Sequence, residues 1–103
     1  MSAETAAMDV WGVPYTQRGG VTLIERKHAA ACVTQIIKSG ARFFGYDAFA
    51  VDADAIQPFL EFSPNWSRGN VPALDLILSE IDSHPSQITH YDFVFEPVTS
   101  VAD

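Results

Sequence analysis

Two short aromatic-rich segments separated by an acidic turn restrict the fold more than any other feature of this chain. The first segment, ARFFGYDAFAV (residues 41–51), contains aromatic and branched residues and no helix-capping residue, which predicts a strand. Because side chains alternate between the two faces of a strand, its residues divide into two sets. Phe44, Tyr46, Ala48 and Ala50 are expected on one face, and Phe43, Gly45, Asp47, Phe49 and Val51 on the other.

The second segment returns after a turn at residues 52–54. Residues 55–62 (AIQPFLEF) predict another strand, in which Pro58 cannot donate a ladder hydrogen bond and therefore indicates a sheet edge. A helix over residues 53–62, capped by Asp54, is the main alternative. Pro58 would then lie inside that helix and clash with the preceding turn, so the pattern favours a hairpin.

Helical spacing precedes this hairpin. Thr22 and Glu25 form a capping-box pattern and Gly40 supplies a helix C-terminal signal, which together predict a helix over residues 22–38. Its apolar residues recur three and four positions apart, as one helix face requires. They are Ala29, Val33, Ile36 and Ile37.

A loop at residues 63–70 leads to a second predicted helix. Asn70 can cap this helix, Pro72 suits its first turn, and residues 83–85 (SHP) end it. Its apolar stripe consists of Val71, Leu74, Leu78 and Ile81. Residues 88–96 (ITHYDFVFE) then alternate as a third strand.

These elements predict one α+β domain over residues 1–103. It is expected to contain a small, mainly antiparallel sheet of three or four strands with two helices packed on one face. Residues 10–20 are expected to be irregular with a short edge strand, and residues 1–9 and 98–103 to be loose tails. A chain of 103 residues can bury enough apolar surface to fold without a disulfide, which its single cysteine, Cys32, cannot form internally.

Charge is distributed unevenly along the chain. Residues 1–42 hold five basic and three acidic residues, a net charge of +2, whereas residues 43–103 hold one basic and ten acidic residues, a net charge of −9. An acidic surface disfavours nucleic acid and anionic membranes, and it speeds association with a basic protein. The charge pattern therefore predicts a protein partner, with no binding to nucleic acid or membrane.

Several simple features predict a cytoplasmic protein without a cofactor. The N-terminal sequence MSAETAAMDV lacks the basic and apolar regions of a signal peptide, and no apolar run approaches the roughly 18 residues of a membrane span. A single cysteine is typical of a reducing compartment. His28 and Cys32 have the spacing of zinc ligands on a helix, but no second ligand pair accompanies them, so no metal site is predicted.

The sequence contains no catalytic signature, and the chain is not expected to be an enzyme. Ser63 and Ser67 lie in the predicted loop, but their spacing from His84 and His90 does not indicate a nucleophile with its base. A glycine-rich phosphate-binding loop is absent, and the acidic turn lacks the remaining ligands of a calcium-binding loop.

A binding surface is the stronger prediction. Seven of the twelve aromatic residues lie between positions 43 and 66, and a three-stranded sheet cannot cover both of its faces. Tyrosine and tryptophan are frequent at binding hot spots, and nearby carboxylates attract the basic side chains of a partner. The candidate partner-binding residues are Tyr46, Asp47, Asp52, Asp54, Glu61 and Trp66. Core packing of the aromatic residues and solvation of the acidic turns are the alternatives.

The stretch from Ala41 to Ser67 resembles the central hairpin of small immunity proteins of bacterial polymorphic-toxin systems. The resemblance covers ARFFGYDAFAV, the acidic turn and IQPFLEFSPNWS. Those immunity proteins are cytosolic, single-domain and commonly acidic. The resemblance implies that the chain binds a cognate toxin, often a basic nuclease, and blocks its activity, but it implies no individual binding residues.

Two other functions are compatible with the sequence. A small enzyme or ligand-binding domain would use a pocket between the sheet and the helices, with Tyr46, His90 and Asp92 as its polar groups. Convergence of those three side chains on one pocket would distinguish this function from protein binding. A structural subunit of a larger assembly would instead use the aromatic face as an oligomer contact.

Overall fold

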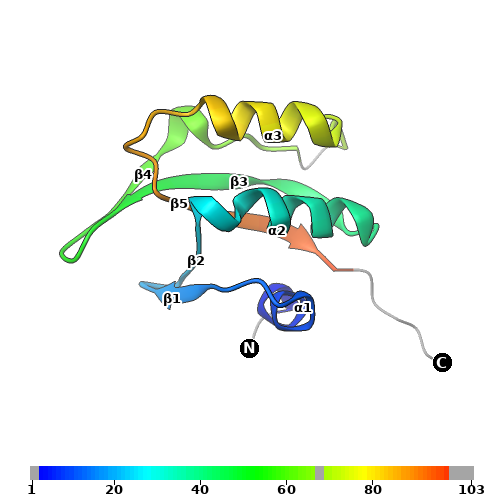
Figure 1. Ribbon diagram of the computed structural model, residues 1–103, viewed down its shortest axis with the longest axis horizontal. Coiled ribbons are helices and arrows are strands. Elements are labelled where there is room, and N and C mark those ends of the chain that lie inside the picture. Colours follow the sequence, from blue (N-terminus) through cyan, green and yellow to red (C-terminus); the bar gives the residue numbers. More distant parts are fainter. Residues whose placement is uncertain (1–2, 67–68, 98–103) are drawn as a thin grey trace.

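The computed structural model describes residues 3–66 and 69–97, which form an antiparallel sheet and a layer of helices. The elements are α1 (Ala3–Trp11), β1 (Thr16–Arg18), β2 (Val21–Glu25), α2 (Arg26–Lys38), β3 (Arg42–Val51), β4 (Ile56–Phe59), the 3-10 helix η1 (Leu60–Phe62), α3 (Leu74–Ser83) and β5 (His90–Glu96). The strand order is β1-β2-β5-β3-β4, and every neighbouring pair is antiparallel. Helices α2 and α3 lie side by side against the sheet (Figure 1).

The predicted α+β class is confirmed, but the described residues contain one strand and one helix more than expected. The additional helix, α1, lies in the segment predicted to be a loose N-terminal tail, so that prediction is wrong. Met8 is fully buried and the Trp11 ring stacks on Phe95 with 5.6 Å between ring centroids. These two apolar anchors, three positions apart, hold α1 beside β5 (Figure 1). The tail predicted at residues 98–103 lies outside the described residues.

The start of the first predicted helix is also wrong. Thr22 and Glu25 belong to β2, and α2 begins only at Arg26 without a side-chain cap. The capping pattern coincides with a segment rich in β-branched residues, in which Thr22 pairs with β1 and Ile24 pairs with Tyr91 of β5. Pairing with two neighbouring strands outweighs the local capping signal. The helix ends at Lys38, as predicted.

The remaining elements follow the sequence pattern closely. Strand β3 spans the predicted segment, β5 covers most of residues 88–96, and the short strand β1 lies at a sheet edge. Strand β4 is an edge strand as Pro58 indicated, although η1 replaces its second half. The cap predicted at Asn70 is wrong, because α3 starts at Leu74 after Ala73.

A β-bulge in β3 changes which aromatic residues share a face. The register with β5 shifts between Phe43 and Gly45, so Phe43 joins Tyr46 and Ala48 in the core. Phe44 instead lines a groove on the other face together with Asp47. The strict alternation predicted for residues 43 and 44 is therefore wrong, because the extra residue of a bulge reverses the order of faces.

The main hydrophobic core lies between the sheet and the α2–α3 layer. Strand β5 contributes Tyr91, Phe93 and Phe95 to this core, and the intervening residues point to the opposite side. We call that opposite side the open face. Its residues on the two central strands are Asp47, Phe49, His90, Asp92 and Val94.

Candidate functional site

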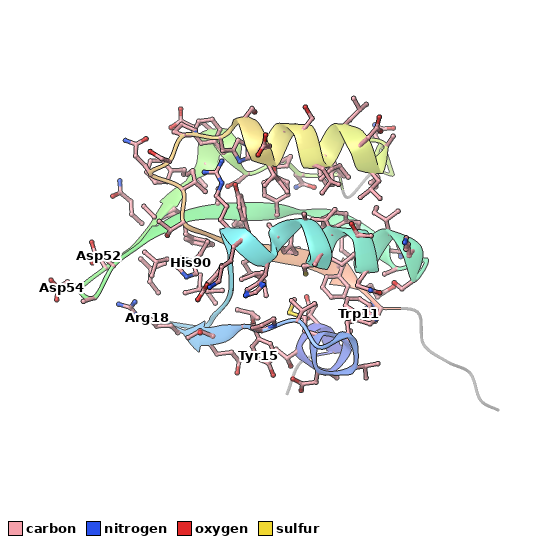
Figure 2. The ribbon with its side chains drawn as sticks, viewed as in Figure 1. Trp11, Tyr15, Arg18, Asp52, Asp54 and His90 are labelled. Atoms are coloured by element: carbon pink, nitrogen blue, oxygen red, sulfur yellow. The ribbon has the colours of Figure 1, made fainter. Side chains whose placement is uncertain are left out.

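The six candidate partner-binding residues do not form one patch. Asp52 and Asp54 lie at the tip of the β3–β4 turn (Figure 2). Asp47 lies on the open face, and Glu61 lies in η1. Tyr46 and Trp66 pack with the core. The acidic residues are therefore divided among separate regions of the surface.

Tyr46 is a core residue, and the prediction that it contributes to an exposed recognition face is wrong. Its exposed fraction is 1%, and its hydroxyl donates a hydrogen bond to the Glu80 carboxylate of α3. Burial, followed by this carboxylate, raises the pKa of Tyr46. Trp66 is half-buried and packs edge-on against Tyr46 and Phe43, with 5.1 Å between the Phe43 and Trp66 ring centroids.

The two acids of the β3–β4 turn have a local structural role. The Asp52 side chain accepts hydrogen bonds from the backbone N–H groups of Asp54 and Ala55, at 2.8 and 2.9 Å. Arg18 of β1 donates to the Asp52 and Ala53 carbonyl oxygens, at 2.8 and 3.1 Å. This contact links the β1–β2 hairpin to the turn (Figure 2) and places a basic residue beside these acids.

Asp47 and Asp92 lie directly opposite each other on the open face. Like charges at such a cross-strand position repel each other. Burial, followed by the charge of Asp47, raises the pKa of Asp92 to about 6, while a hydrogen bond from the Thr22 N–H opposes the shift and Glu4 of α1 adds to it. The central strands thus hold a carboxyl group that is partly protonated near pH 6.

We expect Asp92→Asn to raise the free energy of unfolding by about 1–2 kcal/mol at pH 7. The pKa of Asp92 in the folded protein lies above its ordinary value of 3.8, so Asp92 favours folding below pH 3.8 and this contribution is lost as pH rises through about 6. Urea unfolding at pH 4.5, 6 and 7.5 would show the gain of the variant growing with pH. A constant gain would contradict the raised pKa. Comparing variant with parent removes the contribution of His84 and His90, whose pKa values are lowered by burial.

A groove of about 330 Å³ extends from Asp47 along the open face. We call it the open-face groove; its lining includes Phe44, Asp47, Leu60, Pro64 and Val94. Leu60 is 80% exposed and Val94 is 38% exposed. Two exposed apolar side chains beside a carboxylate are the composition of a protein-binding surface rather than of a folded core.

A second groove, of about 390 Å³, lies between η1 and α3. We call it the η1–α3 groove; Glu61 and Phe62 line it from η1, and Glu80 and His84 from α3 and its end. His84 is buried, and its Nδ1 lies 2.8 Å from the hydroxyl oxygen of Tyr91. Burial lowers the pKa of His84, so its neutral form is favoured. Each carboxylate is exposed at the groove surface.

Residues 60–65 separate the two grooves, and we call this segment the ridge. Ser63 and Pro64 line both grooves. The Ser63 hydroxyl donates to the Phe59 carbonyl at 2.9 Å and accepts from the Ala48 N–H at 3.1 Å, which holds the ridge against β3. Leu60 is exposed on the ridge, and carboxylates lie on both sides of it.

The carboxylates beside the ridge are not neutralised by the described basic residues. Within residues 3–66 and 69–97, the ion pairs are Lys27 with Glu25 and Arg42 with Glu96. Arg26 donates to backbone carbonyls rather than to a carboxylate. Asp47, Glu61 and Glu80 therefore remain negative groups without a described counter-ion.

The three polar side chains proposed for an enzyme or ligand-binding pocket do not converge. Tyr46 faces the helices, whereas His90 and Asp92 face the other side of the sheet. The Ser63 hydroxyl is bound to backbone groups, and Ser67 lies outside the described residues. Cys32 is buried, and burial raises its pKa to about 12. The described part of the chain brings together no three side chains suited to holding a metal ion.

No protein-family model, curated protein or solved structure gives a significant match to this chain. Among the described helices, none has the length and apolar character needed to cross a membrane. The chemistry of the site follows from its own geometry. Exposed apolar side chains, negative groups on both sides and two shallow grooves suit contact with a basic protein surface.

Sequence patterns identified only some of these residues. Asp47 and Glu61 were predicted from their place beside the aromatic segments, but Leu60, Glu80 and Val94 were not. Leu60 was expected inside a strand, and Glu80 lies outside the apolar stripe predicted for the second helix. Glu80 is held beside the η1–α3 groove because the Tyr46 hydroxyl of β3 donates a hydrogen bond to its carboxylate. These two residues are 34 positions apart in sequence.

Proposed function

We propose that this chain is a protein-binding domain that neutralises a basic toxin protein, with the ridge and its two grooves as the contact surface. The observation that carries the proposal is that the ridge exposes Leu60 and Glu61 between Asp47 and Glu80, and that none of these three carboxylates has a described counter-ion. A partner with lysine or arginine side chains would supply counter-ions to these carboxylates.

The net charge and the hairpin support the same function. A net charge of −7 steers the chain toward a positively charged partner and raises the association rate. Carboxylates on a protein inhibitor can take the place of the phosphates that a nuclease binds. The resemblance of residues 41–67 to bacterial immunity proteins implies a partner in the cytoplasm, where such a toxin must be held inactive.

Co-expression with the protein encoded next to this chain would test the proposal. We expect the chain to restore growth of cells that produce that protein, and the purified pair to form a complex. Continued cell death, with no complex at micromolar concentration, would overturn the proposed function. Sedimentation of the chain alone would separately detect self-association.

Charge reversal would locate the contact surface. We expect Asp47→Lys and Glu61→Lys each to slow association with the toxin by about tenfold or more at low salt, because rim charges act mainly on the association rate. Asp54→Lys makes the same charge change at the β3–β4 turn and is expected to have an effect below about threefold. Stopped-flow kinetics would measure all three variants. Equal effects at all three positions would indicate net charge alone.

A further inference from the structure

The open-face groove begins where a closed part of the sheet ends. Leu23 and Phe49 are 2% and 7% exposed although they lie outside the core that the helices cover. The β1–β2 hairpin curls over this region, since Arg18 binds the β3–β4 turn and Gly19 lies against Ile56. The open face is thus closed at one end and exposed at the other.

The two aspartates lie at the boundary between these parts. Along the central strands, the Phe49–His90 pair lies on the closed side, the Asp47–Asp92 pair comes next, and Val94 lies beyond it opposite Gly45. Asp92 is half-buried at this boundary, and the Thr22 N–H donates to its carboxylate. Asp47 lines the groove, and Asp92 lies opposite it on β5, so a cation that binds at Asp47 lies close to a second carboxylate.

We propose that the open-face groove binds a segment of the partner in which an arginine or lysine neighbours an apolar residue. The cationic group lies between Asp47 and Asp92, and the apolar side chain packs against Leu60 and Val94. This inference rests on the proposed function and specifies which group of the basic partner is recognised. A guanidinium fits best, because its planar donors can bind two carboxylates at once.

Charge complementarity selects this occupant over a second copy of the chain. No lysine or arginine among the described residues lines the groove. A second copy carries the same net charge of −7, so its approach adds repulsion to a position where two carboxylates already repel each other. A cation removes that repulsion, whereas an apolar segment alone would bury the two carboxylates without a counter-ion.

Binding of a cation is coupled to release of a proton from Asp92. The charged and titratable groups around Asp92 are Asp47 on β3, Glu4 on α1, His90 on β5 and Glu25 of β2 opposite His90. A cation favours ionised Asp92, whose pKa is raised to about 6. Affinity for the segment is therefore expected to be about tenfold lower at pH 5 than at pH 7.

A short peptide probe would test the groove directly. The probe is N-acetyl-leucyl-arginine amide, and its matched control carries citrulline, which has the shape of arginine without the charge. Titration into ¹⁵N-labelled protein is expected to shift the amide signals of Asp47, Leu60 and Val94. We expect the citrulline peptide to bind at least about tenfold more weakly, since it lacks the charge-assisted contacts. Asp92→Asn is expected to remove most of the pH dependence, and Asp52→Asn to leave it unchanged.

The outcomes separate this inference from the proposed function. Equal binding of both peptides, shifts centred on the β3–β4 turn, or an unchanged pH dependence in Asp92→Asn would overturn the inference. If the chain still protects cells from the toxin in that case, the proposed function stands with a different contact. If the arginine peptide binds in the groove but no toxin is neutralised, the recognised group is correct and the proposed function is wrong.

Discussion

Replacing Arg26 with alanine is expected to lower the free energy of unfolding by about 3 kcal/mol. The guanidinium donates to five backbone carbonyls that end α3 and lead into β5: those of Ile81, Asp82, His84, Pro85 and Ile88, at 2.7–3.4 Å. The C-terminal end of a helix is the negative end of its dipole, which strengthens these contacts. Thermal unfolding should show a decrease in Tm of roughly 10–20 °C.

Two variants distinguish the geometry of Arg26 from its charge. Arg26→Lys keeps the charge but has no planar fork, so it is expected to recover less than half of the lost stability. Lys27→Ala removes the next basic side chain, whose pairing with Glu25 at 3.3 Å is exposed to solvent. That control is expected to change stability by no more than about 0.5 kcal/mol. Full recovery with lysine would show that the carbonyl contacts contribute little.

The same contacts matter for the proposed binding surface. Arg26 fixes the end of α3 and the chain around His84, and His84 and Glu80 line the η1–α3 groove. Arg26 lies within the helix predicted over residues 22–38 but is not one of its predicted apolar residues, so the pattern assigned it no contact. Its actual partners are carbonyls 55 to 62 positions away, so no local pattern could reveal this role.

Local periodicity predicted those elements in which helix signals and strand signals do not compete. The body of α2, the strand β3 and most of β5 follow from helical spacing or alternation. Residues 22–25 show where this fails, because one short segment carries both a helix-capping pattern and the β-branched residues Thr22 and Ile24. Two neighbouring strands decide between them, and one of these, β5, is far away in sequence. Helix α1 was not predicted because it is stabilised by the burial of Met8 and by the stacking of Trp11 on Phe95 of β5, which is distant in sequence.

The candidate site was predictable in composition but not in arrangement. Asp47 and Asp92 each interrupt an aromatic strand, which marks them as unusual. Their cross-strand pairing depends on register, and a shift of one residue moves a side chain to the other face. The bulge between Phe43 and Gly45 produces such a shift within β3. A glycine inside a strand pattern is a signal of a bulge, so this feature had a sequence sign.

Replacing Gly45 with alanine is expected to destabilise the fold by about 3–5 kcal/mol and to displace the ridge. Gly45 has a φ of +132°, and an added Cβ would lie 2.1 Å from the carbonyl oxygen of Pro64. The neighbouring backbone cannot move aside easily, because Asn65 forms a bridge with Gly45 and the Trp66 N–H donates to the Phe44 carbonyl at 2.7 Å.

Gly20→Ala is the matched control for this change. Gly20 also has a positive φ, of +80°, but an added Cβ there meets open space, so the expected cost is about 1 kcal/mol from backbone strain alone. The difference between the two variants in urea unfolding measures the contact with Pro64. If Gly45→Ala folds with the stability of the Gly20 variant, the ridge is not held by this close approach. In the expected case, residual folded Gly45→Ala protein should also bind the toxin more weakly, because the ridge forms a wall of both grooves.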